Sequence, residues 1–351
     1  MSDMLMDDAE TNVTRVESVL PNPTRADRGT TIRPRSGWAF INVGELWRYR
    51  ELLFFLTWRD VKIRYKQSLL GIAWAVIQPT LYMVVFTIVF GKMAKVPTDG
   101  IPYPLFSFSA LILWNFYAVG IAQAGNSLLM SSPLVTKVYV PRLTIPFASV
   151  GSALFDFFVS FSVLLLVMVF YVNVSTIDTS GVDVGPIMFM VLPILFLTIL
   201  LALGVGTMLA ALNVAYRDFK HTIPFLVQLW MFSTPAIYMS INEPAADASP
   251  PAAVQQDESM AKAYGQSQGK TSENQVKGAT DSSEELGIWG YVKKALQLNP
   301  MNGLIASFRA ALLGHALPWR ELGYSTLMVI LGFIFGCMYF YRLEPKFADI
   351  I

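Results

Sequence analysis

Six long runs of residues that are almost free of charge constrain this sequence more than any other feature. The runs are residues 69–90, about 104–127, about 143–172, about 187–212, about 223–241 and about 323–341. Asp156 is the one Asp, Glu, Lys or Arg that they contain. A helix rises about 1.5 Å per residue, so each run is long enough to cross a hydrocarbon core of about 30 Å. The sequence therefore predicts an all-α polytopic membrane protein with six transmembrane helices.

The composition excludes several other classes of protein. The 351 residues are 54% hydrophobic and 15% charged, whereas a soluble globular chain is about 25% charged. We therefore exclude a soluble enzyme, a secreted disulfide scaffold and a disordered chain. One cysteine, Cys337, allows no internal disulfide, and two histidines leave little for a His-based metal site. The net charge of +1 gives no indication of nucleic-acid binding.

The basic residues of the short connections predict the orientation of the helices. The 20 residues before the first run, the connections 128–142 and 213–222, and the tail after the sixth run carry 11 Lys and Arg residues in total. The connections 91–103 and 173–186 carry 2. Because cytoplasmic loops are enriched in Lys and Arg, we expect both termini to lie in the cytoplasm.

The N-terminal part of the chain divides into a tail and a helix. Residues 1–44 are polar and rich in proline and glycine, so we expect a flexible cytoplasmic tail without a signal peptide. Residues 45–68 predict an amphipathic interface helix at the membrane surface. The apolar residues whose spacing places them on one face are Trp47, Phe54, Trp58, Val61 and Tyr65. The residues assigned to the interface are Trp47, Arg48, Trp58, Arg59, Lys62, Arg64 and Lys66. The alternative is a cytoplasmic helix packed on the protein's own loops.

The connection between the fifth and sixth runs differs from the other connections. Residues 243–287 are rich in Ala, Ser, Gln, Gly, Glu, Asp and Lys with one aromatic, Tyr264, and they predict a disordered external insert. Residues 288–322 become apolar again and predict short external gate helices. The helix at 299–314 is too short to span, so we expect it to dip into the outer leaflet or to cover a pore mouth. Residues 323–351 hold the sixth span and a cytoplasmic tail.

Motifs for catalysis or nucleotide binding are absent from the sequence. The string from Gly265 to Thr271 resembles a phosphate-binding loop, but three residues separate its glycines where the loop needs four. HExxH and paired CxxC motifs do not occur. We therefore predict that this chain is not an enzyme and makes and breaks no covalent bond itself, with no catalytic residue, no metal site and no cofactor.

Asp156 lies deep in a predicted span, which makes it a candidate functional residue. The alternative is a structural carboxyl that hydrogen-bonds to Asn115, Gln123, Asn126 or Gln228. Aromatic residues are candidates for a conduit because flat rings offer apolar faces to sugars. The candidate conduit or gate residues are Tyr82, Phe86, Trp114, Asn115, Asp156, Tyr238, Phe308 and Arg309.

Small residues recur at a four-residue spacing in two of the runs. They are Ala202, Gly206 and Ala210 in the fourth run, and Gly332 and Gly336 in the sixth. This spacing lets helix backbones approach closely, and we expect it to serve packing within one subunit.

Several strings, in order along the chain, resemble one family. They are LLFFLTWRDVKIRYKQSLLGIAWAV within residues 45–90, NSLLMSSPLVTKVYVPRLTIPF (126–147), NVAYRD (213–218), STPAIY (233–238), NPMNGLIASFRAALLG (299–314) and the tail LEPKFADII. Together they resemble the ABC-2 type permeases that export polysaccharides such as O-antigen, capsular polysaccharide and teichoic acid. The tail before residue 40 and the insert 243–287 exceed the compact pattern of that family.

The resemblance implies partners and site residues. It implies a multi-pass homodimer in the inner (plasma) membrane of a bacterium, with lipid-linked polysaccharide as cargo. A separate ATPase, which holds ATP and Mg, would bind each subunit on its cytoplasmic side. Spans one to five would lie in residues 69–242, with coupling loops at 131–142 and 213–222. The residues expected to contact the ATPase are Leu134, Val135, Lys137, Val138, Tyr139, Pro141, Arg142, Arg217 and Asp218.

Three alternatives remain open at this point. A membrane enzyme of glycan assembly, such as a polymerase or ligase, would use polar residues near the membrane face; the candidates are Asp156, Arg309, His315 and Arg320. An ion-coupled carrier would show inverted repeats and intramembrane charges, and we find no repeat. An ABC-2 exporter of drugs or simple lipids would belong to the same family.

Overall fold

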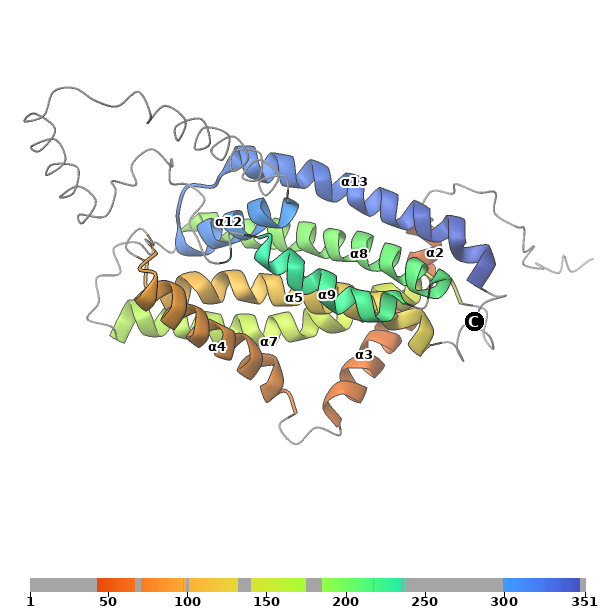
Figure 1. The fold of residues 1–351 in the computed structure, drawn as a ribbon, viewed down its shortest axis with the longest axis horizontal. Helices are drawn as coiled ribbons and strands as arrows, with labels where there is room; N and C mark the ends of the chain where they lie inside the picture. The colour runs from red at the N-terminus through yellow and green to blue at the C-terminus, as the bar shows by residue number, and fades with distance from the viewer. Residues whose placement is uncertain are drawn as a thin grey trace, which may run out of the picture. The chain divides into compact units, whose positions relative to one another are not determined.

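Every regular element in the described part of the computed structural model is a helix. The described residues are 43–66, 71–96, 98, 101–131, 140–174, 185–216, 218–234, 237 and 299–347. The α-helices are α2 (Val43–Arg48), α3 (Arg50–Lys66), α4 (Ala73–Phe86), α5 (Tyr103–Met130), α7 (Thr144–Val174), α8 (Val191–Ala215), α9 (Phe219–Phe232), α12 (Pro300–Leu313) and α13 (Trp319–Leu343). The π-helix η1 (Thr87–Met93) continues α4, while η2 (Pro186–Met190) precedes α8 and η4 (Glu344–Lys346) follows α13 (Figure 1). The predicted tail, up to residue 42, and the predicted insert 243–287 lie outside the described residues.

Five helices of the described chain are long and apolar enough to cross a membrane. They are Ala73–Met93, Tyr103–Met130, Thr144–Tyr171, Pro186–Ala215 and Trp319–Leu343. These helices coincide with the first four runs and the sixth run of the sequence. In the fifth run, α9 has 14 residues, which at about 1.5 Å per residue is too short to span alone. Residues 238–241, the predicted end of that run, lie outside the described residues.

α5 forms the centre of the bundle. It is the most buried of the five helices of spanning length, and α4 is the least buried. α7 and α8 pack along α5, and α13 packs on α8 (Figure 1). The fully buried side chains of α5 include Phe108, Phe116 and Tyr117. A helix that is apolar on all sides is suited to this central position.

A proline inside α4 is compatible with the helix because α7 supplies a hydrogen bond. Pro79 has no N–H group, so the carbonyl of Ala75, four residues earlier, lacks its helical donor. The hydroxyl of Ser160 in α7 donates to this carbonyl oxygen over 2.7 Å. A neighbouring helix therefore satisfies the backbone group that the proline frees, as a membrane interior requires.

α8 and α13 cross where two glycines bring their backbones into contact. A Cβ added at Gly336 would overlap with the backbone oxygen of Gly204, and a Cβ at Gly204 would lie 2.6 Å from Phe333 Cα. Gly206 is close to α5, because a Cβ there would lie 2.7 Å from Ala124 Cβ. The predicted close packing within one subunit is confirmed for Gly206 and Gly336. At Gly332, by contrast, an added Cβ would meet nothing within 4 Å.

The predicted interface helix is broken near its start. A turn at Tyr49 separates α2 from α3, and the Tyr49 N–H bonds over 3.2 Å to Leu46 O, three residues earlier. Trp47, Phe54 and Trp58 are exposed, whereas Val61 is buried. Val61 is thus covered by the protein and the half-buried Tyr65 bonds to Asp156 of α7, so the predicted apolar face is exposed in its first part only.

The two glycines of α13 give a matched pair of substitutions. We expect Gly336→Ala to destabilise the folded chain by about 1–3 kcal/mol, because the new methyl group meets backbone that cannot rotate away. Gly332→Ala is expected to change the stability by less than about 1 kcal/mol, because its methyl group enters open space. Thermal unfolding in detergent measures both effects. Equal losses for the two variants would contradict the assigned contact between α8 and α13.

Candidate functional site

α3 packs on the first half of α7 through small side chains. The Thr57 hydroxyl lies 3.3 Å from Ala148 O and 2.9 Å from Leu53 O, and either oxygen can accept its hydrogen. A Cβ added at Gly151 would lie 2.9 Å from Thr57 Oγ1. Leu56 of α3 is also buried. Close packing therefore fixes the distance between the two helices.

A polar network joins the end of α3 to α7. Arg64 forms an ion pair with Asp156, and the Tyr65 hydroxyl donates a hydrogen bond to the same carboxylate. Arg64 Nη2 also donates to Ser152 Oγ over 3.0 Å. Ser152 Oγ in turn lies 3.0 Å from Gln123 Oε1 of α5. Side chains from three helices therefore meet around Asp156.

These contacts satisfy a carboxylate that is 9% exposed. Removing a carboxylate from water is costly unless an opposite charge and hydrogen bonds replace the water. Burial raises the pKa of Tyr65 to about 12, and its hydrogen bond to Asp156 acts in the same direction. The phenol is therefore protonated at neutral pH and can donate. Asp156 pairs with α3 rather than with any of the four amides expected from the sequence, although Gln123 is reached through Ser152.

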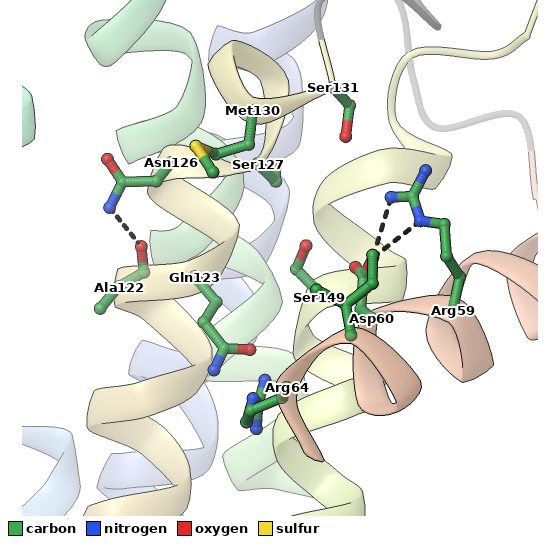
Figure 2. A pocket seen from close by; sticks show the side chains of 11 residues that line it. Arg59, Asp60, Arg64, Ala122, Gln123, Asn126, Ser127, Met130, Ser131 and Ser149 are labelled. Carbon is green, nitrogen blue, oxygen red and sulfur yellow. Dashed lines mark hydrogen bonds and ion pairs between the residues drawn. The ribbon is translucent and has the colours of Figure 1, made fainter. Parts of the chain in front are cut away.

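A pocket of about 680 Å³ lies beside this network, between α3, the last part of α5 and the first part of α7. Figure 2 shows Arg59 and Asp60 on α3, with Gln123 and Asn126 on α5. Arg59 Nε and Nη2 lie 3.0 Å and 2.8 Å from Asp60 Oδ1. Arg64 also lines the pocket, so the pocket and the network share a residue. Guanidinium, amide and hydroxyl groups therefore face one cavity.

The residues assigned to the interface helix divide into two groups. Trp47, Arg48, Trp58, Lys62 and Lys66 are exposed. Arg59 and Arg64 are half-buried and line the pocket. Each of these two arginines pairs with a carboxylate of the protein, and their assignment to the membrane surface stays a prediction.

The residues predicted to contact an ATPase fall mainly outside the described residues. Those outside are Leu134, Val135, Lys137, Val138, Tyr139 and Arg217. Asp218 is exposed just before α9, and Pro141 is half-buried. Arg142 donates to the backbone oxygen of Glu344, and its guanidinium carbon lies 6.0 Å from the centroid of the Phe347 ring. The C-terminal tail thus anchors one end of the predicted coupling loop.

α12 is a short helix inside the bundle. Twelve of its 14 residues are buried, so it does not lie on the outer surface of the subunit. The side chain of Asn299 caps the helix by accepting from Met301 N over 3.0 Å. The same amide accepts from Trp230 Nε1 over 3.0 Å and donates to Thr234 Oγ1 over 2.8 Å. Asn299 therefore joins the start of α12 to the end of α9.

Two candidate gate residues are buried side chains of α12. Phe308 is fully buried, and its ring centroid lies 6.2 Å and 6.3 Å from those of Phe157 and Phe161. The guanidinium carbon of Arg309 lies 3.4 Å from the centroid of the Phe106 ring in α5. Such a cation–π contact is attractive, and more so when the cation is desolvated.

The other conduit candidates do not gather around these residues in the described chain. Tyr82 is exposed and Phe86 half-buried on α4, while Trp114 is buried in α5 and Asn115 half-buried beside it. Tyr238 lies outside the described residues. The structure therefore brings together Asp156, Arg64 and Tyr65, but it does not gather one aromatic conduit within the described part of this chain.

Tyr65 and Gln123 were not among the predicted site residues. Tyr65 was assigned to an apolar face, yet it precedes the basic Lys66 and follows Arg64 at the end of the helix. The useful signal is Asp156 itself, since a nearly buried carboxylate needs a cation and hydrogen-bond donors. The sequence alone does not select these partners, because Arg64 and Asp156 are 92 positions apart.

Comparisons with known proteins agree with this architecture. The sequence profile of the ABC-2 type transporter family matches residues 51–245, which is more than half of the chain. An O-antigen export system permease protein RfbA of Myxococcus xanthus is 28% identical over 312 residues, covering 88% of this chain and 98% of that protein. Two proteins of the same name from Klebsiella pneumoniae are 24% and 21% identical, covering 57% and 88% of this chain and 72% and 97% of their own lengths. The chain belongs to the ABC-2 type transporter family and is a multi-pass membrane transport subunit.

Proposed function

We propose that this chain is the permease subunit of an ATP-driven exporter that moves a lipid-linked polysaccharide from the cytoplasm across the inner membrane of a bacterium. The main support is the similarity to three O-antigen export permeases, two of which match over 88% of this chain. The family match over residues 51–245 supports the transport class independently. The cargo is a proposal from the names of these relatives.

The proposed topology has six spans with both termini in the cytoplasm. Five helices of spanning length support it, as does the excess of Lys and Arg in the predicted cytoplasmic connections. α9 starts the proposed fifth span, with residues beyond Phe232 completing it. In this topology α3 and the pocket lie on the cytoplasmic side, and α12 lies towards the outside.

The proposed energy source is a separate ATPase. The sequence has no complete phosphate-binding loop, so ATP and Mg are assigned to that partner. A homodimer of this chain with two ATPase subunits would form the exporter. The loops 131–142 and 213–222, with the surface helix α3, are the proposed docking elements. The network around Asp156 supports this assignment, since it ties α3 to two helices of the bundle.

Reconstitution tests the proposed function. The chain is co-purified with its candidate ATPase and placed in liposomes with a fluorescent lipid-linked polysaccharide. We expect a stoichiometric ATPase and ATP-dependent transfer of the glycan across the bilayer, with an ATPase-inactive partner as control. Transfer or glycan synthesis by the chain alone would overturn the proposal. ATP-dependent transfer of simple lipids or drugs but not of the glycan would overturn the cargo assignment.

The coupling loop gives a second test. We expect Leu134→Asp with Tyr139→Asp to abolish ATPase binding, because charged groups replace the apolar side chains proposed to enter the partner's groove. Ala94→Asp is the control, because Ala94 is exposed just after the end of η1, in the connection 91–103 that is predicted to be external. Co-purification measures binding, and membrane insertion is checked separately. Retained ATPase binding and normal export in the double variant would contradict the docking assignment.

The ion pair gives a third test. Arg64→Met leaves a nearly buried carboxylate with one partner fewer, and we expect it to destabilise the chain by about 3 kcal/mol. Arg64→Met combined with Asp156→Leu removes both charges, so its stability is expected to lie within about 1 kcal/mol of the parent. If the ion pair between Arg64 and Asp156 passes a movement of α3 on to α7, the double variant should bind the ATPase but export less glycan per ATP hydrolysed. Parental coupling in the double variant would show that the pair serves stability alone.

A further inference from the structure

We propose that the pocket between α3, α5 and α7 binds the phosphate group of a lipid at the cytoplasmic membrane surface. The position of the pocket at that surface rests on the topology given under the proposed function. Its volume, about 680 Å³, falls in the range of about 300–1,000 Å³ that is usual for ligand pockets. It therefore has room for a lipid headgroup.

The lining residues offer more hydrogen-bond donors than acceptors. Arg59 uses Nε and Nη2 on Asp60, and Arg64 uses its two terminal nitrogens on Asp156 and Ser152. In the described chain this leaves Arg59 Nη1 and Arg64 Nε as donors with no other partner. Because a guanidinium presents five N–H donors in a fork, pairing along one edge keeps others available.

One amide and one hydroxyl of the lining add further donors, whereas the hydroxyls of Ser127 and Ser149 donate to backbone oxygens and leave only acceptors. Gln123 Oε1 lies 3.0 Å from Ser152 Oγ, which can donate its one hydrogen either to it or to Ser149 O at 2.8 Å. The Gln123 NH₂ group is a further donor. The Ser131 hydroxyl also lines the pocket and has no hydrogen-bond partner within the described residues. Against these donors, Asp60 provides the one carboxylate of the lining, and one of its oxygens already accepts from Arg59.

This imbalance favours phosphate over a neutral sugar. An ionised phosphate offers acceptors only, and arginine matches its geometry through paired N–H groups. Each hydroxyl of a sugar carries a donor hydrogen as well as acceptor lone pairs, and these hydrogens would find few acceptors here. Aromatic rings, on which sugars stack, are also missing from the lining, all of which the structure describes.

The phosphate can come from two sources that share this chemistry. One is a phospholipid of the surrounding membrane, and the other is the (pyro)phosphate that joins a polysaccharide to its lipid carrier. α3 has exposed aromatic residues, including Phe54 and Trp58, so a lipid at the surface is close to the pocket in either case. The test below separates the two sources.

Binding to the full-length chain in detergent is measured by native mass spectrometry with soluble probes. The probes are dioctanoyl phosphatidic acid, dioctanoylglycerol, inorganic phosphate and a short-chain polyprenyl pyrophosphate. We expect phosphatidic acid to bind and dioctanoylglycerol, which lacks phosphate, not to bind. Tighter binding of the polyprenyl pyrophosphate would identify the carrier lipid as the ligand. Equal binding of the two phosphate-bearing lipids would identify bulk phospholipid. Binding of inorganic phosphate as tight as that of either lipid would overturn the assignment to a lipid.

Two variants locate the binding in the pocket. Arg59→Gln is expected to weaken binding at least about tenfold, because a charge-assisted donor is lost. Met130→Glu places a like charge on an exposed residue of the rim and is expected to weaken binding as well. Arg50→Gln is the matched control, because it removes the same charge from the same helix outside the pocket. Thermal midpoints without probe verify the fold of each variant.

The outcomes separate this inference from the proposed function, because binding is measured without the ATPase or export. Unchanged affinity in both pocket variants would overturn the pocket site, as would an equal loss in Arg50→Gln. Loss of ATPase binding in Arg59→Gln with unchanged lipid affinity would assign the pocket to a protein partner and overturn the inference. A site that binds phosphate-bearing lipids in a chain that exports no glycan would refute the proposed cargo but leave the pocket assignment standing.

Discussion

A polar group inside a bilayer cannot rely on water, so each one in this bundle must find its partner on another part of the protein. The carbonyl of Ala75 accepts from Ser160 of α7, and the buried side chain of Asn213 donates to Gly125 O of α5 over 2.9 Å. Asp156 obtains its partners from α3. Each contact joins two helices that are distant in the sequence. Apolar side chains can repack with a modest loss of stability, but a buried polar group that loses its partner is strongly destabilising. These contacts therefore fix the register of the helices.

The same constraint explains why α3 is more than a helix resting on lipid. Its outward side carries exposed aromatic residues such as Phe54 and Trp58, which suit the membrane surface. Its inward side holds Thr57 against Gly151 and Arg64 against Asp156. Apolar contacts with lipid allow a helix to slide, but an ion pair to a nearly buried carboxylate does not. Close packing and an ion pair together therefore hold α3 in a fixed position on α7.

The parts of the fold that depend on local pattern were predictable from the sequence. The charge-free runs predicted six spans, and five of them are helices of spanning length, since length and hydropathy are properties of each segment alone. The need for a neighbouring helix to satisfy the carbonyl freed by Pro79 was also predictable, although Ser160 as the donor was not. α9 was harder to predict, because hydropathy continues beyond Phe232 while the helix ends there.

The parts that depend on tertiary pairing were not predictable. Local spacing does not connect Asp156 with Arg64, which lies 92 positions earlier. Basic residues on a surface helix are more readily interpreted as contacts to lipid than as partners of a buried carboxylate. Gly204 was not predicted as a packing residue, because it lies outside the four-residue pattern of Ala202, Gly206 and Ala210. The backbone contact with Gly336 becomes visible only when the two helices cross.

The central helix offers a physical connection between the two ends of the subunit. α5 runs without interruption from Tyr103 to Met130, with Phe106 against Arg309 at one end and Gln123 in the network near α3 at the other. These two positions are about 25 Å apart along the helix axis. A buried helix moves more easily as a rigid body than by bending, because bending would break hydrogen bonds that no water can replace. A displacement of α5 by α3 would therefore also move the side chain of Phe106, which Arg309 contacts, so α3 and α12 can be coupled without a contact between them.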